Sequence, residues 1–494
     1  MQVAAIIFLY IYVTCLCLLT AYCLIQAYFM VLYLIYRFKN PYTKGMNTLT
    51  EADLPFVTIQ LPVFNEQYVV ERLIDNIVKI NYPARLLQIQ ILDDSTDETL
   101  TYSSAKVEYY RTRGIDIELI HRTDRTGYKA GALKNGLTTA KGAFIAIFDA
   151  DFLPDEDFIL KCIPYFYQDE RYAVVQTRWE YINRDYSLIT RLQALPLNVH
   201  FSIEQTARMY AGLYLQFNGT GGIWRRKAIE DAGGWSADTL TEDLDLSIRT
   251  QLKGWKIKYI EETGTPSELP VEMNGFKSQQ YRWMKGGAEC ARKLLPAVFK
   301  SDLPFTKKMF TTAYLLSSSV FLLVFLTALL SFPAIFLLDQ TGYKLQWASV
   351  FMVGWALIFP VYLVGNFNPA VRKTFSFKDV LVFVVLFPLL LSLSLGMSLH
   401  NAIAVLDGFR GRKSAFIRTP KYNIVGKTDK LKYTTYRSNK MSFSTRMEYF
   451  MALYFVIAGT AGILYGNISF LGVQVLLFVG FFSIATLSWK HVQK

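Results

Sequence analysis

Histidine and cysteine are scarce in this chain. Its 494 residues include four histidines and five cysteines. The histidines are scattered, and three of the cysteines (Cys15, Cys17 and Cys23) lie together in an apolar stretch near the N-terminus. No pair has the spacing of a zinc-ligand motif, and nothing resembles a disulfide framework. A zinc domain and a disulfide-stabilised scaffold are therefore excluded, and a reducing cytosolic environment fits.

Charged residues are also few. They make up 19% of the chain, whereas 52% is hydrophobic, which is too apolar for an ordinary soluble enzyme. Residues 5–36 carry no charge. This stretch is longer than the apolar core of a signal peptide and long enough to cross a bilayer, so it predicts a transmembrane helix. Because Arg37 and Lys39 follow it directly, the positive-inside rule places residue 40 onward in the cytoplasm.

Further apolar runs occur in the second half of the chain. They cover 311–338, 346–365, 379–406, 447–465 and 468–488. All except 379–406 predict simple membrane spans. That run is interrupted by Pro388 and Gly396 and lies between two basic loops, of which 408–446 carries eleven Lys and Arg residues against one acid. Because both loops should be cytoplasmic, we expect 379–406 to be re-entrant or partly interfacial.

The net charge of the chain is +12, but its basic residues crowd into the loops beside the apolar runs. This distribution favours anionic lipid headgroups and a phosphorylated substrate as binding partners. It speaks against nucleic acid as a partner.

Strands and helices alternate in the pattern between about 54 and 180. Strand-like runs occur at 56–63, 87–92, 115–120, 143–148 and 172–176, and helical stretches near 66–80, 98–113, 129–140 and 156–168 separate them. This alternation predicts a mostly parallel sheet with right-handed crossovers. Residues 180–300 lose the regularity, although 191–210 has the pattern of a helix with a large apolar face.

Acidic residues follow two of the predicted strands. Asp94 comes after 87–92, and Asp149 and Asp151 come directly after 143–148. Ligands bind beyond the carboxyl ends of such strands. Two carboxylates this close repel each other unless a cation lies between them, and Mg²⁺ or Mn²⁺ holding a phosphate would suit. Taken alone, an Asp-x-Asp pair is more often an ordinary acidic turn. Phe64, after the first strand, could stack on a nucleobase.

Several separated motifs coincide with these acids in a fixed order. Thr241-Glu242-Asp243 and Gln279-Gln280-Tyr281-Arg282-Trp283 follow the strand region. Together with Asp94 and Asp149-Ala-Asp151, and between membrane helices, they resemble the processive family 2 glycosyltransferases: the cellulose, hyaluronan and chitin synthases and the plant cellulose-synthase-like proteins. The likeness covers roughly 50–300 and is strongest to plant-type mannan and xyloglucan-backbone synthases. Further matches are Gln176-Thr-Arg-Trp179, Phe217-Asn-Gly-Thr220, Ala232-Gly-Gly-Trp235 and Ser267-Glu-Leu-Pro270.

The resemblance implies an α/β GT-A glycosyltransferase domain, with a Rossmann-like and mostly parallel sheet, inserted between transmembrane helices. The chain would then divide into five parts. These are an N-terminal transmembrane helix (1–40), a cytoplasmic GT-A catalytic domain with interfacial helices (41–300), transmembrane helices with a re-entrant or interfacial segment (301–407), a cytoplasmic basic gating-like loop (408–446) and a transmembrane hairpin (447–494).

For the donor, the resemblance implies roles at the strand ends. Asp151 would be the principal ligand of Mg²⁺ or Mn²⁺, with Asp149 contacting the ribose or the metal. Asp94 would bind the edge of the nucleobase, and Lys129 would lie near the donor. The metal and cationic donors would stabilise the charge on the leaving nucleoside diphosphate. Asp243 would be the general base that deprotonates the acceptor hydroxyl.

The remaining motifs would bind the diphosphate, the acceptor or both. Gln279 and Arg282 would contact the diphosphate, and Trp283 would offer a flat face to the terminal sugar. The acceptor contacts would also include Glu242, Phe217, Asn218, Gly219 and Thr220. In the basic loop, Phe416, Thr419 and Lys421 resemble the gating-loop motif of cellulose synthases, although Arg418 replaces the usual Val. A basic loop on anionic lipid is the alternative for this segment.

The predicted function is inverting, processive transfer of a hexose from UDP-glucose or GDP-mannose to a growing polysaccharide. We expect β-1,4 linkages in this polymer, which the protein would also translocate. A non-processive enzyme with a lipid acceptor, like ceramide glucosyltransferase or a polyprenyl-phosphate transferase, is the first alternative. A channel or transporter with a nucleotide-binding domain is a remote one. We expect an integral membrane protein of a bacterial inner membrane or a eukaryotic Golgi or plasma membrane. The sugar, and whether an accessory subunit or a homo-oligomer is involved, stay open.

Overall fold

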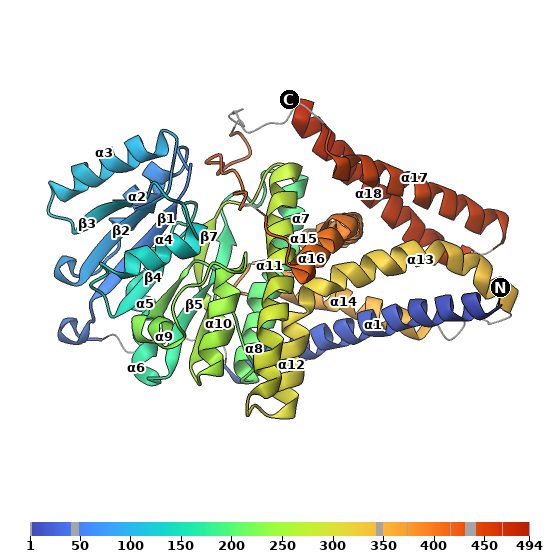
Figure 1. Cartoon of the computed structure of the whole chain (residues 1–494), viewed down its shortest axis with the longest axis horizontal. Coiled ribbons are helices and arrows are strands. Elements are labelled where there is room, and N and C mark those ends of the chain that lie inside the picture. The colour runs from blue at the N-terminus through green and yellow to red at the C-terminus, as the bar shows by residue number, and fades with distance from the viewer. Residues whose placement is uncertain are drawn as a thin grey trace.

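The computed structural model describes residues 2–40, 49–341, 349–372, 374–414, 416–429, 441–466 and 468–493. An α/β domain lies at one end of the molecule and long apolar helices extend from it at the other (Figure 1). Part of the loop 408–446, which we predict to be a gating-like loop, lies outside the described residues. The segment that reaches the α/β domain, 416–424, is described.

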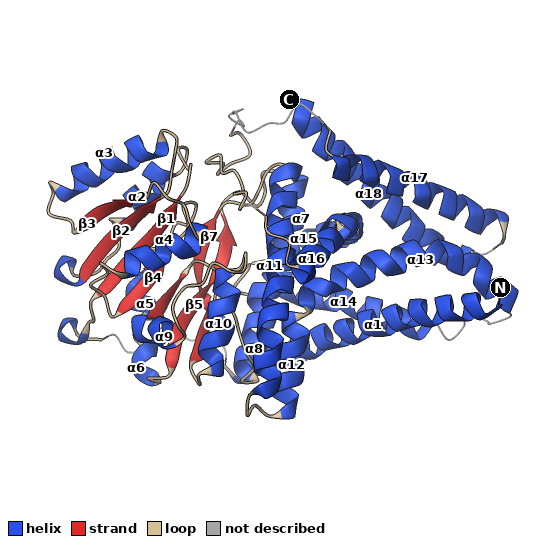
Figure 2. Ribbon diagram, viewed as in Figure 1, coloured by secondary structure: helices blue, strands red, loops and turns tan. Residues whose placement is uncertain are grey.

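The α/β domain is built on one sheet with the strand order β3-β2-β1-β4-β6-β5-β7 (Figure 2). Its strands are β1 (Val57–Val63), β2 (Leu87–Asp93), β3 (Ile117–His121), β4 (Phe144–Ile147), β5 (Tyr172–Tyr181), β6 (Gly222–Arg225) and β7 (Lys256–Ser267). The first four are parallel, whereas β6 runs antiparallel to both of its neighbours. β1 and β4 are almost wholly buried, as expected for strands covered on both faces. β4 is apolar throughout, whereas the buried Thr58 and Gln60 of β1 hydrogen-bond to side chains of β2.

The predicted strands are confirmed, with shifts of a few residues and a longer β5, but β6 and β7 were missed. β6 is only four residues long and antiparallel. β7 carries Lys256, Lys258, Glu261 and Glu262, and these charges hide its alternating burial in the sequence. Local pattern therefore identified the parallel half of the sheet, and pairing between distant segments completes it.

Helices cover both faces of the sheet. One core cluster packs β1 and β2 against α2 (Val70–Ile77), α3 (Thr99–Arg111) and α5 (Phe158–Cys162). A second cluster packs β4, β5 and β6 against α4 (Tyr128–Leu137), α9 (Arg226–Asp231) and α10 (Glu242–Leu252). The domain also contains α6 (Tyr165–Gln168) and the 3₁₀ turns Glu51–Asp53 and Ala84–Leu86. This arrangement leaves the carboxyl ends of β1, β2 and β4 open for a ligand.

A layer of helices separates the α/β domain from the apolar helices (Figure 1). It contains α7 (Leu188–Val199), a π-helical segment (His200–Glu204), α8 (Gln205–Tyr210), α11 (Met273–Lys300), α12 (Phe305–Leu315) and α16 (Ser398–Arg410). α7, the π-helical segment and α8 together confirm the helix predicted over 191–210. The basic end of α1 (Gln2–Lys39) docks on the domain, where Arg37 pairs with Glu261 and Glu262 of β7.

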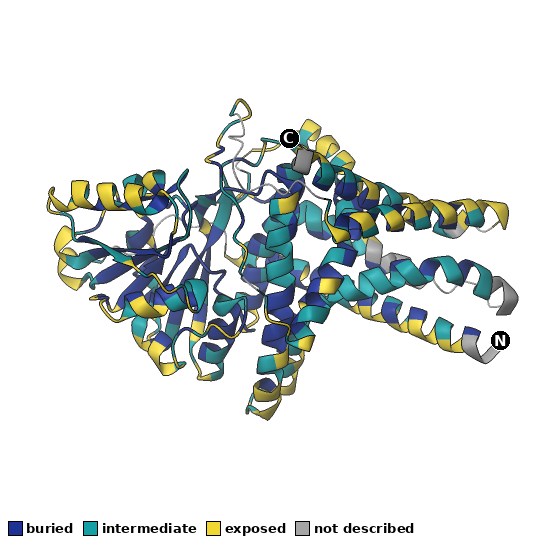
Figure 3. Ribbon diagram, turned by 45° about the horizontal axis from the view of Figure 1, so that its top comes forward, coloured by how far each residue is buried: buried dark blue, intermediate teal, exposed yellow. Residues whose placement is uncertain are grey.

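The apolar helices are α1, α13 (Val320–Thr341), α14 (Ser349–Asn366), α15 (Phe377–Gly396), α17 (Phe443–Leu464) and α18 (Leu471–Gln493), with 3₁₀ turns at Ser317–Ser319 and Ile468–Phe470. Among the described residues, five helices are long and apolar enough to cross a membrane: Ala5–Lys39, Ser317–Leu337, Phe377–Gly396, Phe443–Leu464 and Leu471–Lys490. Side chains along these helices are exposed (Figure 3), and on α1 they include Ile7, Ile11 and Leu18. Such apolar exposure suits contact with lipid.

The run 379–406 forms two helices, and its interruption lies only where Gly396 ends α15. The predicted interruption at Pro388 is wrong, because α15 runs through this proline. A proline removes one backbone hydrogen bond, and an apolar helix tolerates this loss when its neighbours support it. α15 packs on α7 and α18, and α16 packs along α11. α15 is itself one of the five helices long and apolar enough to cross a membrane. The re-entrant or interfacial placement of 379–406 therefore stays a prediction.

Candidate active site

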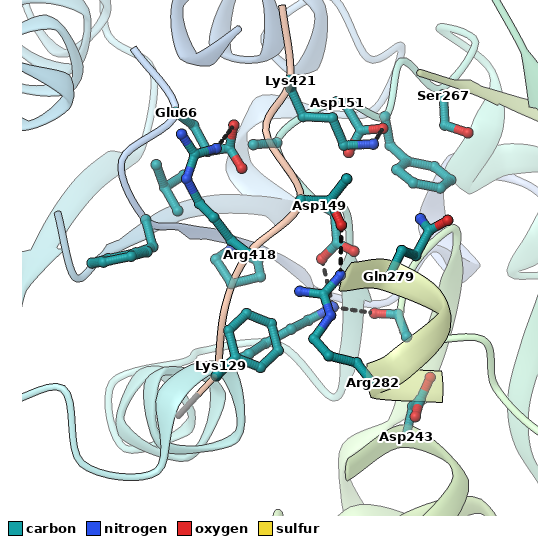
Figure 4. Close-up of a pocket in the computed structure, with 18 of the residues that line it drawn as sticks. Glu66, Lys129, Asp149, Asp151, Asp243, Ser267, Gln279, Arg282, Arg418 and Lys421 are labelled. Carbon is teal, nitrogen blue, oxygen red and sulfur yellow. Dashed lines mark hydrogen bonds and ion pairs between the residues drawn. The ribbon is translucent and has the colours of Figure 1, made fainter. Parts of the chain in front are cut away.

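One cavity opens at the carboxyl ends of β1, β2 and β4 (Figure 4). All of the predicted site residues except Phe217 and Thr220 line it. Its wall combines the strand ends, the first turn of α10, one face of α11 and the segment 416–421. The structure thus brings together motifs that lie more than 350 residues apart in the chain.

The acid pair after β4 meets two lysines from other parts of the chain. Asp149 Oδ1 accepts a hydrogen bond from Lys129 Nζ at 2.5 Å. Asp151 Oδ2 accepts from Lys421 Nζ at 2.7 Å and from the backbone N–H of Glu268 at 3.0 Å. Each carboxylate therefore has its own ammonium partner, which offsets the repulsion between them.

Asp149 and Asp151 are the residues that could hold a divalent cation. Their carboxylate oxygens are the hard ligands that Mg²⁺ and Mn²⁺ prefer. Among the described residues, no group of three or more His, Cys, Asp or Glu side chains is arranged to hold a metal. A cation bound here would take its other ligands from a diphosphate and water, which suits a small cation of this kind. The residues present fit such a metal, although Lys421 Nζ now contacts the carboxylate oxygen of Asp151 that would bind it.

Two further acids begin α10 side by side. Burial raises the pKa of Asp243 to about 7, and the negative charge of Glu242 adds to this effect. Burial also raises the pKa of Glu242. Lys129 Nζ lies 4.0 Å from Glu242 Oε1, and Asp243 Oδ1 accepts from the backbone N–H of Leu244 at 2.8 Å. A carboxylate with a pKa near neutrality is suited to accept a proton at physiological pH.

The loop before β6 brings backbone close to Asp243. Gly219 has a left-handed conformation (φ +80°), and a Cβ atom there would lie 3.0 Å from Asp243 Oδ2. Asn218 also lines the cavity, and its Oδ1 lies 3.0 Å from His200 Nε2. Glycine is therefore required at 219 for two reasons, its backbone conformation and the space left by the carboxylate.

Phe217 and Thr220 do not line the cavity, which corrects their predicted role as acceptor contacts. Phe217 is fully buried and packs edge-on against Trp224, with the ring centroids 5.5 Å apart. Thr220 Oγ1 accepts from the backbone N–H of Asp149 at 2.9 Å. Their side chains instead hold the loop against the sheet, because an apolar ring and a buried hydroxyl both find partners in the core.

Gln279, Arg282 and Trp283 line the cavity from one face of α11. The motif lies inside α11, where residues three and four positions apart share a face. Arg282 donates to the carbonyl of Ile417 at 3.0 Å and to Thr419 Oγ1 at 2.8 Å. Burial lowers the pKa of Arg282 to about 10, so the guanidinium stays charged.

The segment 416–421 lies across the cavity and is held at several points. Besides the contacts of Lys421 and Arg282, the guanidinium of Arg418 pairs with Glu66 at 2.8 Å. Burial raises the pKa of Glu66 to about 7. The Tyr422 backbone N–H donates to Glu268 Oε1 at 2.9 Å. Arg418, the departure from the family motif, thus has an acid of the cavity wall as its partner.

Sequence reasoning assigned no role to Glu66, Glu268 or Arg418. Glu66 follows the first predicted strand closely, which is a signal that could have been used, whereas Glu268 follows β7, a strand that the sequence pattern does not reveal. Their partners in the 416–421 segment are recognisable only from the tertiary structure.

The chain was compared with known proteins. The model of a family described as glycosyltransferase like family 2 matches residues 55–286. Glucomannan 4-beta-mannosyltransferase 7 of Arabidopsis thaliana is 33% identical over 432 residues, which cover 84% of this chain and 73% of that protein. Glucomannan 4-beta-mannosyltransferase 1 of Oryza sativa subsp. japonica is 33% identical over 405 residues, which cover 80% and 74%. The chain belongs to glycosyltransferase family 2.

A solved structure confirms the fold class of this glycosyltransferase. A mannosyltransferase from Pyrobaculum calidifontis, in complex with GDP-Man and Mn²⁺, aligns with a TM-score of 0.53 and 20% identity over 80% of this chain and 100% of that one. The predicted GT-A fold, family and hexosyltransferase activity are thus confirmed. The alternative of a non-enzymatic channel or transporter is wrong.

Proposed function

We propose that this glycosyltransferase transfers mannose from GDP-mannose to the end of a growing β-1,4-linked polysaccharide. The observation that carries the proposal is the likeness to glucomannan 4-beta-mannosyltransferases along most of both chains, combined with a cavity in which the family motifs converge. UDP-glucose is the competing donor.

In this proposal Asp243 is the general base. It accepts the proton of the acceptor hydroxyl as the hydroxyl oxygen attacks the anomeric carbon, and the bond from that carbon to the diphosphate breaks. A base of this kind contributes about 10²–10⁴-fold to the rate. The raised pKa of Asp243 suits this role, because the group can accept a proton near pH 7.

Cationic side chains stabilise the leaving diphosphate in this proposal. The planar guanidinium of Arg282 and the ammonium of Lys421 can each donate hydrogen bonds to phosphate oxygens. Asp149 and Asp151 would hold Mg²⁺ or Mn²⁺, which would supply further stabilisation of the charge on the leaving group. Lys421 therefore has to release Asp151 when the donor is bound. We assign Lys129 to the donor side as well, through its contact with Asp149.

The acceptor lies on the opposite side of the cavity in this proposal. Trp283 offers an aromatic face to the terminal sugar, and Glu242, Asn218 and Gly219 surround the base. Closure of the 416–421 segment over the donor would exclude water and so limit hydrolysis.

We further propose that the enzyme is processive and passes the polymer through its own apolar helices, with the α/β domain in the cytoplasm. The helices that could span a membrane support this, as does the basic end of α1 docked on the domain. A lipid acceptor, which needs no such passage, is the alternative.

The test is transfer by the purified protein in detergent with Mn²⁺ or Mg²⁺ and radiolabelled GDP-mannose, UDP-glucose or GDP-glucose. We expect a polymer made from GDP-mannose that a β-mannanase digests. Transfer only from UDP-glucose would overturn the donor assignment, and a single sugar on a lipid would overturn processivity. Asp243→Asn should abolish transfer and retain donor binding, whereas Asp231→Asn, at an exposed carboxylate beside Trp255, should leave transfer intact.

A further inference from the structure

Two arginines lie beside Asp94 and Phe64, the residues that we expect to meet the nucleobase, and only Arg122 has an acidic partner among the described residues. Arg122 pairs with Asp94, with Nε donating to Oδ1 at 2.8 Å and Nη2 to Oδ2 at 2.5 Å. Arg125 makes no ion pair with any described acid. Its guanidinium lies 3.2 Å from the centroid of the Phe64 ring, and its Nε is buried with no hydrogen-bond partner.

The guanidinium of Arg125 covers the face of Phe64 on which a base would stack. It is planar and cationic, and a planar base can replace it on an aromatic face. Phe64, Asp94 and Arg125 all line the cavity, and Pro62 and Leu92 add apolar surface beside them. A base that displaced Arg125 would leave the guanidinium beside the edge of the base, with donors that need acceptors.

The backbone of Arg125 is held by a turn, and its guanidinium packs against aromatic rings. Its carbonyl accepts from the N–H of Tyr128 at 3.0 Å. Gly127 and Tyr128 both have left-handed conformations, with φ of 77° and 49°. For a tyrosine this conformation is strained, and such strain concentrates at functional sites. The turn therefore presents Arg125 to the cavity in a fixed position.

We propose that Arg125 determines the nucleobase specificity of the donor site by donating to O6 and N7 of guanine, while one carboxylate oxygen of Asp94 accepts from N1–H. This assignment rests on the proposed function, in which the donor is GDP-mannose. Arg122 occupies one acceptor site on each oxygen of Asp94, and the second site of one oxygen stays available for N1–H of the base.

The edge chemistry of the two bases explains the selectivity. Guanine offers two adjacent acceptors that match the fork of an arginine. Uracil has one donor, N3–H, between two carbonyl oxygens that are not adjacent to each other, so the fork of Arg125 would find a single acceptor. A guanidinium N–H group that loses contact with water and finds no acceptor on the base weakens binding, so the site discriminates against uracil.

The test measures binding of GDP, UDP and 7-deaza-GDP, which lacks the N7 acceptor, by titration calorimetry of the full-length protein in detergent with Mn²⁺. The variants are Arg125→Leu, Arg125→Lys and the control Arg113→Leu. Arg113 is a matched control, because its guanidinium lies 3.4 Å over the Tyr109 ring and is exposed outside the cavity.

We expect wild type and Arg113→Leu to prefer GDP over UDP and to bind 7-deaza-GDP more weakly than GDP. Arg125→Leu should weaken GDP binding by about 5- to 100-fold with little change for UDP, and should lose the penalty for 7-deaza-GDP. Arg125→Lys should restore only part of the preference, because an ammonium cannot bind both acceptors as a fork.

Other outcomes separate the two proposals. Equal weakening of GDP and UDP in Arg125→Leu would make Arg125 a stacking or phosphate contact and overturn the assignment alone. An unchanged GDP preference in that variant would also overturn it alone. A wild-type preference for UDP would overturn the donor of the proposed function and, with it, this assignment. Continued binding of UDP by Arg125→Leu shows that the variant is folded.

Discussion

Replacing Glu242 by glutamine tests how the fold controls the charge of the proposed base, Asp243. The pKa of Asp243 is raised from its ordinary 3.8 to about 7, first by burial and then by the negative charge of Glu242. A general base acts only when deprotonated, so kcat/KM should fall as the pH decreases through 7. With a pKa of 7, about one tenth of the groups are ionised at pH 6 and about nine tenths at pH 8, which predicts about a ten-fold difference in kcat/KM.

Glu242→Gln removes a negative charge and keeps the burial. We call the fall of kcat/KM at low pH the acidic limb, and its midpoint reports the pKa of Asp243. In Glu242→Gln this midpoint should move below 7 but stay above 3.8, because burial, the largest cause of the raised pKa, is unchanged. The ratio of activity at pH 6 to activity at pH 8 should then rise. The absolute rate should also fall if Glu242 contacts the acceptor, but this does not move the midpoint.

The assay is kcat/KM for donor turnover by purified protein from pH 5 to pH 9, with each profile normalised to its value at pH 8. Glu230→Gln is the control, because Glu230 is exposed and pairs only with Arg226 across one helical turn. An acidic limb in Glu242→Gln that is unchanged, or that moves to higher pH, would refute the reasoning. A limb that persists in a residually active Asp243→Asn variant would assign it to another group.

Two further predictions concern close contacts. Gly480→Ala should destabilise the packing of α15 on α18 by about 1–3 kcal/mol, seen as a lower melting temperature in detergent, because its Cβ would lie 2.0 Å from the carbonyl oxygen of Ser392. Gly472→Ala, on the same helix with nothing within 4 Å, should melt like wild type, and equal losses in both would contradict the packing argument. Lys421→Ala should tighten the binding of Mn²⁺ in the absence of donor by about ten-fold, because the substitution frees the carboxylate of Asp151. Electron paramagnetic resonance measures this affinity. The same variant should transfer sugar more slowly. Unchanged Mn²⁺ affinity would show that Lys421 does not compete with the metal.

The sequence alone was sufficient for the class of protein and for most of the site. An uncharged stretch such as 5–36 predicts a helix, because backbone groups in apolar surroundings must hydrogen-bond to one another and a helix achieves this within one segment. Asp149 and Asp151 follow a short apolar run, and parallel strands place such residues at one edge of the sheet. The order of motifs then identified the family. Each of these features is a pattern within a short stretch of chain, or the order of such patterns along it. Such features can be recognised without a structure.

Only the tertiary structure decided which side chains meet. Phe217 and Asn218 are neighbours in the chain, yet one is in the core and the other lines the cavity. Lys421 reaches Asp151 across 270 positions. Arg122 and Arg125 are three residues apart, but one neutralises Asp94 and the other covers Phe64. Spacing in the chain limits which contacts can form. Which of them do form depends on the packing of distant elements, because a side chain is buried or paired with a charge only when those elements meet.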